Sequence, residues 1–227
     1  MIGTMTNVLL VLAGGALGLL IKKGLPKKSE TMLFQVIGLF TLGLGIFSIT
    51  KTIRPVSLIL GFMLGSVVGE LVGLEDMLSS FGEGARKALH GGERFVDGMV
   101  VAFVTFCVGP MTILGAIQDG LGDPTILVVK SIMDGSVSVA YASTFGAGVL
   151  LSTVPMLLYQ LPLTFLASSL KPYMTQVVLD NLSAQGGILL LGLGINLLEI
   201  KKVKVANMLP AIVTVPLVTL LLTPLGF

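Results

Sequence analysis

The sequence predicts an all-α protein, a polytopic bundle of membrane-spanning helices, and three observations lead to this fold class. Hydrophobic residues make up 54% of the 227 residues, charged residues make up 11%, and the mean hydropathy is +1.00. Apolar runs bounded by charge, Pro or Gly recur along the chain, and about 20 such residues cross a bilayer as a helix. One long polar segment interrupts them. We therefore expect a single membrane domain, residues 1–227, with about eight transmembrane helices, or seven.

The apolar runs give approximate bounds for each span. In chain order, the predicted spans are residues 3–21, 31–50, 55–74, 97–117, 125–151, 153–170, 185–200 and 204–224. The polar segment, residues 75–96, has apolar residues at helical spacing opposite charged ones, which is typical of a helix that lies in the membrane interface.

Basic residues predict the orientation of these spans. With the N-terminus outside, the cytoplasmic loops hold ten of them: Lys22, Lys23, Lys27, Lys28, Arg86, Lys87, Arg94, Lys201, Lys202 and Lys204. The outer loops then hold three, Lys51, Arg54 and Lys171. The excess of Lys and Arg on the cytoplasmic side favours eight crossings with both termini outside and residues 75–96 in the cytoplasm.

A short internal repeat carries much of the functional argument. Residues 38–46 read GLFTLGLGI, residues 187–195 read GILLLGLGI, and each opens a hairpin with a short basic turn. In the eight-span scheme the two hairpins turn on opposite sides, which is the inverted-topology repeat of many secondary transporters. The repeat halves would be residues 1–75 and 153–227, with the middle spans at 97–151. Alternatively, the glycines merely allow helices to pack closely.

The middle spans carry signals for broken helices. Gly109 and Pro110 interrupt one apolar run, because Pro lacks a backbone donor and clashes with the preceding turn. Gly120 follows an Asp in a turn-like pair, and Gly135 lies in a turn-like Asp-Gly-Ser sequence within the next run. Helices broken at membrane depth indicate a transport site, since protein or a water-filled cavity must cover the freed backbone groups.

Lys130 and Asp134 are the charged residues that most need an explanation. They lie one helical turn apart inside an apolar run, and a charge at the bilayer centre costs about 2.5–3.5 kcal/mol on insertion scales. They would form either a self-neutralising structural pair or a site that binds a solute or relays protons.

Four further polar residues are candidates for the same path. Asp119 belongs to the path or to a turn at the outer surface, and Asp123, before a Pro, belongs to the path or caps the next helix. Gln160 and Asn207 contact a solute or, like Asn7 and Asn196, form hydrogen bonds between helices.

At the level of whole motifs, the chain resembles a bacterial inner-membrane family that is catalogued as a domain of unknown function, the YdfK and YqgA type. The motifs are VGPMTILGAIQDGLGDPTILVVKSIMDG, then ASTFGAGV, YQ and NMLPA. The matching positions are Gly109, Pro110, Met111, Asp119, Gly120, Asp123, Lys130, Ser131, Asp134, Gly135, Gln160 and Asn207. The resemblance implies a multi-pass protein of the bacterial plasma membrane and leaves its activity open.

No enzyme signature is present: the sequence has no phosphate-binding loop, no metal-ligand spacing and no catalytic triad, so we expect no catalytic residue, metal or cofactor. The leading hypothesis is a small secondary transporter or channel for an ion or small polar solute, lined by the fourth and fifth spans. The alternative is a structural or regulatory membrane protein that binds partner helices. We expect the lipid bilayer as a partner, a homodimer or higher homo-oligomer packed through glycine faces, and no nucleic acid.

Overall fold

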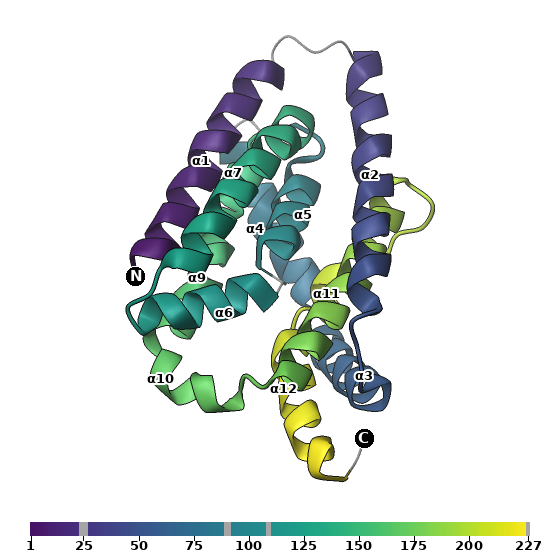
Figure 1. Cartoon of the computed structure of the whole chain (residues 1–227). Coiled ribbons are helices and arrows are strands. Elements are labelled where there is room, and N and C mark those ends of the chain that lie inside the picture. The colour runs from purple at the N-terminus through teal and green to yellow at the C-terminus, as the bar shows by residue number, and fades with distance from the viewer. Residues whose placement is uncertain (23–26, 89–91, 108–109, 226–227) are drawn as a thin grey trace. The chain divides into compact units, whose positions relative to one another are not determined.

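The computed structural model describes residues 1–22, 27–88, 92–107 and 110–225, and these residues form helices and no strand (Figure 1). In chain order the helices are α1 (Ile2–Lys22), α2 (Lys27–Ile49), α3 (Pro55–Val72), α4 (Leu74–Ala88), α5 (Phe95–Cys107), α6 (Pro110–Gly120), α7 (Thr125–Phe145), α8 (Gly148–Leu151), α9 (Thr153–Phe165), α10 (Ala167–Leu170), η1 (Lys171–Tyr173), α11 (Gln176–Leu197), η2 (Val205–Met208), α12 (Ala211–Leu222) and η3 (Thr223–Leu225). The predicted all-α class is confirmed.

Contacts divide the chain into two compact units. Unit 1 comprises Met1–Thr31 and Ser80–Pro172, and unit 2 comprises Met32–Ser79 and Tyr173–Phe227. Each unit combines segments from both ends of the chain, so this division does not test whether residues 1–75 and 153–227 are repeats of each other. The single membrane domain and its repeat halves therefore stay predictions.

Unit 1 is organised around the contact between α1 and α7, which run in the same direction. A Cβ atom added to Gly14 would lie 2.0 Å from the Gly135 carbonyl oxygen, and one added to Gly18 would lie 2.4 Å from the Val139 oxygen. The two backbones approach so closely only because these α1 positions lack side chains. This close contact fixes the register of α7 against α1.

Unit 2 consists of two helical hairpins, α2 with α3 and α11 with α12, and glycines bring them together. A Cβ added to Gly45 would lie 2.8 Å from the Gly187 oxygen, and one added to Gly187 would lie 2.6 Å from the Gly45 oxygen. A Cβ added to Gly194 would lie 3.1 Å from the Gly38 oxygen. Thus α2 and α11, which carry the two copies of the repeated sequence, contact each other in antiparallel directions.

Several helices are long and apolar enough to cross a membrane. The described residues contain six: Ile2–Lys22, Pro55–Val72, Thr125–Phe145, Gly148–Phe165, Gln176–Leu197 and Val205–Leu222. The pair α5 and α6, bent by 66°, would make a seventh if it forms one span. The predicted span 31–50 corresponds to α2, whose apolar part, Gln35–Ile49, is shorter than these.

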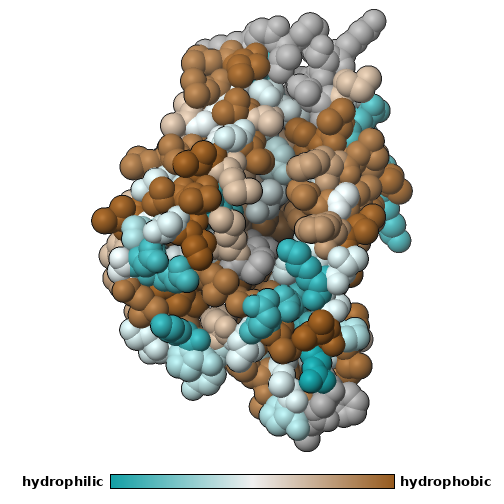
Figure 2. Space-filling view, in the orientation of Figure 1, coloured by the Kyte–Doolittle hydropathy of each residue, from teal (hydrophilic) through white to brown (hydrophobic). Residues whose placement is uncertain are grey.

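Large apolar side chains are exposed on these helices, as in a protein that faces lipid. Figure 2 shows them over α1 and over α2, where Leu17 and Leu39 are 57% and 62% exposed. Residues 75–88 of the polar segment lie in the single helix α4. Its place in the interface stays a prediction.

Candidate functional site at the break between α5 and α6

The break between α5 and α6 leaves a backbone carbonyl without its helical donor. In a continuous helix the Phe106 carbonyl would accept from the amide of residue 110, which is a proline and has no N–H. Two side chains replace that donor: the Thr112 hydroxyl at 2.7 Å and the Lys130 ammonium at 2.9 Å. The break thus draws a charged side chain of α7 to a freed carbonyl in the interior of unit 1.

The pairing of Lys130 with Asp134 is the central feature of this site. The Lys130 Nζ atom lies 2.7 Å from Oδ1 and 2.6 Å from Oδ2 of Asp134, and the two residues are 7% and 5% exposed. Their spacing on α7 places them on one face of the helix. The structure therefore brings together the two charged residues that the sequence predicted, in contact with the predicted break.

Two buried amides in unit 1 complete the polar surroundings. Asn7, on α1, lies close enough to Asp134 to stabilise its charged form. Within the described parts of the chain, the side-chain oxygen and nitrogen of Asn7 and of Gln160 have no hydrogen-bond partner, although both residues are fully buried. In the described residues the Gln160 side chain makes no hydrogen bond, and Asn7 approaches Asp134 of the neighbouring helix α7 without a well-formed one, so the expectation that these amides bond neighbouring helices stays a prediction. Unpaired buried amides are costly and are rare in proteins.

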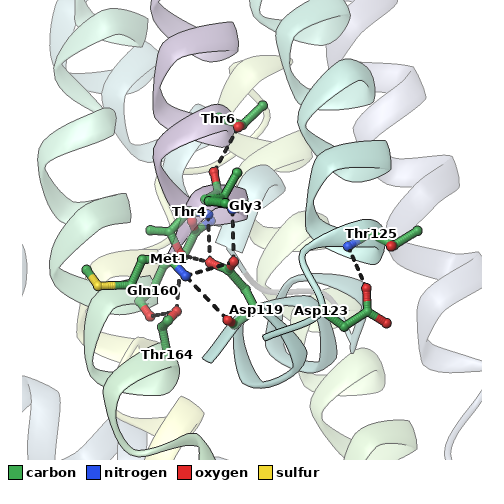
Figure 3. Close-up of polar contacts among 10 residues, drawn as sticks. Met1, Gly3, Thr4, Thr6, Asp119, Asp123, Thr125, Gln160 and Thr164 are labelled. Carbon is green, nitrogen blue, oxygen red and sulfur yellow. Dashed lines mark hydrogen bonds and ion pairs between the residues drawn. The ribbon is translucent and has the colours of Figure 1, made fainter. Parts of the chain in front are cut away.

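Asp119, at the end of α6, caps the first turn of α1. Its carboxylate accepts from the Gly3 amide at 2.9 Å, from the Thr4 amide at 3.0 Å and from the Thr4 hydroxyl at 3.0 Å (Figure 3). The Met1 ammonium lies 2.9 Å from the same carboxylate. Amides in the first turn of a helix lack helical acceptors, so this buried acidic residue satisfies them from another helix.

Polar contacts continue from this cap toward α9. The Thr4 and Thr164 hydroxyls are 3.1 Å apart, and the Thr164 hydroxyl donates to the Gln160 main-chain oxygen at 3.0 Å (Figure 3). Gln160 therefore lies one helical turn from Thr164, which contacts the capped turn of α1. Its side-chain amide adds an unsatisfied group to this part of unit 1.

Asp123 has a local structural role. Its Oδ1 atom accepts from the Thr125 amide at 3.0 Å, at the exposed start of α7 (Figure 3). The hydrogen bonds from the Thr125 hydroxyl and amide hold the pKa of the Asp123 carboxyl below its ordinary value. The predicted N-cap role differs in detail, because Pro124 is the N-cap of α7, and Asp123 accepts from the first helical amide from one residue earlier.

Asn207 lies in unit 2, with a different set of partners. Its side chain accepts from the Glu75 amide at 2.6 Å and donates to the Glu70 carboxylate, which Lys204 also contacts at 2.6 Å. The Glu70 carboxylate raises the pKa of Lys204, chiefly through their hydrogen bond. Asn207 therefore joins η2 to the junction between α3 and α4, as expected for an amide that bonds between helices.

The predicted helix breaks have different outcomes. Gly109 lies outside the described residues, whereas Pro110 begins α6 and Gly120 ends it. The break predicted at Gly135 is wrong, because α7 runs without interruption from Thr125 to Phe145. A glycine inside a helix costs only about 1 kcal/mol relative to Ala, and at this position it admits the close approach of α1.

Metal ligands do not gather in the part of the chain that the structure describes. No group of three or more His, Cys, Asp or Glu side chains there could hold a metal ion. What the site offers is a carboxylate, an ammonium and a carbonyl without its helical donor, with the Asn7 amide beside the carboxylate. These groups can bind a polar or charged solute through hydrogen bonds and charge.

The apolar helices and the buried polar site define a polytopic helical membrane protein. The chain belongs to the family described as "Protein of unknown function (DUF554)", whose model matches residues 2–220. It is 34% identical over 220 residues to "Uncharacterized protein YqgA" of Escherichia coli (strain K12), with 93% of each chain covered. It is 29% identical over 231 residues to "Uncharacterized membrane protein YdfK" of Bacillus subtilis (strain 168), covering 100% of this chain and 99% of the relative. No solved structure matches.

Proposed function

We propose that the protein is a small secondary transporter or channel for an ion or small polar solute, and that the path passes the Lys130–Asp134 pair. The observation that carries this proposal is a buried charged pair bound to a carbonyl freed by a helix break. A break that exposes backbone groups among apolar spans is characteristic of transport sites. The unpaired amide of Asn7 supplies a further group for a solute or water to bind.

The roles of the site residues follow from their contacts. Asp134, Lys130 and Gln160 would contact the solute or its water, since they are buried in unit 1 and carry the charged or unpaired groups. Asp119 and Asp123 hold helix starts near the path. The protein is not expected to be an enzyme.

We propose further that the two repeated sequences belong to an inverted repeat, which would favour a transporter. Gly38 and Gly187 open the two repeated sequences, and Gly45 and Gly194 lie near their ends. Gly45 lies against Gly187, and Gly38 lies against Gly194. The first glycine of each copy therefore contacts the last glycine of the other. Two antiparallel copies related in this way are what an inverted-topology repeat predicts.

Several glycines that could have formed the glycine faces of the expected homo-oligomer contact helices of the same chain. Gly14 and Gly18 pack on α7, and Gly61 and Gly65 pack on α12. The proposed homo-oligomer therefore needs a surface other than these faces. We propose further that the protein resides in the bacterial plasma membrane with both termini outside, on the basis of its basic loops.

Thermal unfolding of the detergent-purified protein against ions, amino acids and small organic acids tests the proposal. A solute present at 100 times its dissociation constant adds about 2.7 kcal/mol to the free energy of unfolding. We expect a shift in the parent and in Asp123→Asn, and none in Asp134→Asn. Uptake of the identified solute into proteoliposomes then separates transport from binding. A cooperative transition that no solute shifts, together with absent uptake, would count against transport.

A further inference from the structure

The Lys130 ammonium is surrounded by oxygens in the way that a bound metal cation would be. Its three N–H donors meet three oxygen atoms, Oδ1 and Oδ2 of Asp134 and the main-chain oxygen of Phe106, at 2.7, 2.6 and 2.9 Å. Two of these oxygens share a full negative charge. The third is a backbone carbonyl freed at a helix break.

This oxygen set has the chemistry of an alkali-cation site. In secondary transporters, unwound backbone carbonyls and the C-terminal ends of half-helices coordinate Na⁺ or H⁺. The Phe106 carbonyl is in the last turn of α5, which ends at Cys107, and the negative end of the helix dipole favours a cation there. The ammonium therefore takes the position that such a metal ion would occupy.

We propose that Lys130 is the site's own tethered cation, that it keeps Na⁺ and K⁺ from binding, and that the coupling ion is the proton, taken up at Asp134. This inference rests on the proposed transport function and names its coupling ion. A metal ion would have to displace an ammonium that is held on the same helix as the carboxylate. It would then leave that ammonium buried without its ionic partner, which is strongly unfavourable.

The proton step changes the charge of the pair. A hydronium ion gives its proton to a carboxylate oxygen of Asp134 and leaves as water, so the carboxylate becomes a carboxylic acid. The net charge of the Lys130–Asp134 pair thereby changes from zero to +1, and the ammonium is left with neutral partners only. The neighbouring polar groups are the Asn7 amide of α1 beside Asp134, the Thr112 hydroxyl of α6, which donates to the same Phe106 oxygen, and the Cys107 thiol, which follows Phe106 on α5. The ammonium, no longer paired with a carboxylate of the protein, can then donate hydrogen bonds to a solute carboxylate or to water.

A purely structural ion pair predicts a different response to removal of the ammonium. Lys130→Met keeps the length and apolar stem of the side chain and vacates the position between the three oxygens. If those oxygens form a cation site, the variant gains a response to alkali ions. A structural pair would lose stability on the same substitution without any selectivity among cations.

The test compares thermal unfolding in LiCl, NaCl and KCl with choline chloride at equal ionic strength. We expect no alkali-specific shift in the parent and a saturable upward shift of about 2 °C or more in Lys130→Met. The double variant Lys130→Met with Asp134→Asn should lose that shift. Lys22→Met is the matched control, because Lys22 donates to a main-chain oxygen of Thr144 at 2.6 Å in the same unit, and it should respond as the parent does.

Two results would overturn the inference: a saturable Na⁺ or K⁺ shift in the parent, or a cooperatively folded Lys130→Met that no alkali ion stabilises. If Lys130→Met does not fold, the melting temperature of the parent is measured between pH 5 and 9 instead. That temperature should vary with pH more than it does in Asp134→Asn, and equal profiles would contradict proton uptake at Asp134. If both a solute and Na⁺ raise the melting temperature of the parent, the proposed transport function stands and only the proton is excluded as its coupling ion.

Discussion

The carboxylate of Asp119, at the end of α6, lies 3.0 Å from the backbone amide of Thr4 in the first turn of α1. A residue far along the chain thereby satisfies the start of the first helix. The carboxylate is 3% exposed, so the contact is protected from water. It ties the second half of the broken span to α1, and α1 in turn packs on α7, which carries Lys130 and Asp134.

Asp119→Ala should therefore destabilise unit 1. Loss of an N-cap costs about 0.5–2 kcal/mol, and the amides of Gly3 and Thr4 would lose a buried charged acceptor, so we expect about 2 kcal/mol or more. Asp123→Ala is the control, because Asp123 also accepts from an amide at the start of a helix but is exposed to solvent, and it should cost less than Asp119→Ala. Denaturant or thermal unfolding of the two variants checks this order, and equal losses would contradict it.

Gly14→Ala should disrupt the contact between α1 and α7. The added Cβ would lie 2.0 Å from the Gly135 carbonyl oxygen, a backbone atom that cannot move without shifting its helix. Overpacking of this kind costs about 1–3 kcal/mol. The matched control is Gly43→Ala, where the added Cβ meets no atom within 4 Å, and where the better helix propensity of Ala should leave stability unchanged or raised by up to about 1 kcal/mol. Melting temperatures that fall equally in both variants would contradict this close packing of α1 on α7.

Asn181→Ala should destabilise unit 2. Its side chain accepts from the Thr52 hydroxyl at 2.6 Å and lies 3.0 and 2.9 Å from the hydroxyls of Ser57 and Thr219. Removing it leaves buried polar groups unpaired, at a cost of about 1–3 kcal/mol. Gln176→Ala, on the exposed start of the same helix, should change the free energy of unfolding by less than about 0.5 kcal/mol. Denaturant unfolding of both variants measures the difference.

Asp123 should contribute a small pH dependence. Hydrogen bonds from Thr125 lower the pKa of its carboxyl in the folded state. A lowered folded-state pKa gives stability that is present above the unfolded-state value of about 3.9 and is lost as the pH falls through the folded-state value. Asp123→Asn keeps a side-chain oxygen without the charge, so the melting difference between parent and variant should be present at pH 7 and shrink as the pH falls below the unfolded-state value. A difference that grows in acid would contradict the assignment.

Local spacing accounts for the parts of the site that could be predicted. Lys130 and Asp134 are four residues apart, so an α-helix places them on one face whatever surrounds it. Asp123 before a proline indicates a helix start by the same local logic. The freed carbonyl was also implied, since a proline at 110 removes the donor for the carbonyl four residues earlier, at Phe106.

Contacts between distant segments explain what the sequence could not provide. The capping of Thr4 by Asp119 depends on the packing of α1 and α6, and a single sequence carries no signal for that pairing. The continuity of α7 through Gly135 likewise depends on α1, because the glycine that resembles a turn residue serves a helix contact. Asn7 was assigned to bonds between helices, and only the structure places it beside Asp134 without a hydrogen-bond partner.

Asn7→Leu should separate folding from function. The Asn7 amide is fully buried and unpaired among the described residues, which costs about 1–3 kcal/mol. Leucine has a similar volume and no polar atoms, so the variant should unfold at a higher temperature than the parent when no solute is present. The same variant should lose the solute-induced shift in melting temperature. An unpaired amide beside the charged pair lowers stability, and we expect that the Asn7 amide is there to bind the solute.

Asn181→Leu is the control for Asn7→Leu, since it removes an amide that is fully hydrogen-bonded and should lower the melting temperature. If Asn7→Leu also lowers it, the Asn7 amide is paired in solution, through water or Asp134, and belongs to the packing of the bundle. If it raises the melting temperature while the solute response persists, the amide is outside the binding site. The combination of a raised melting temperature and a lost response is what a functional amide beside Asp134 requires.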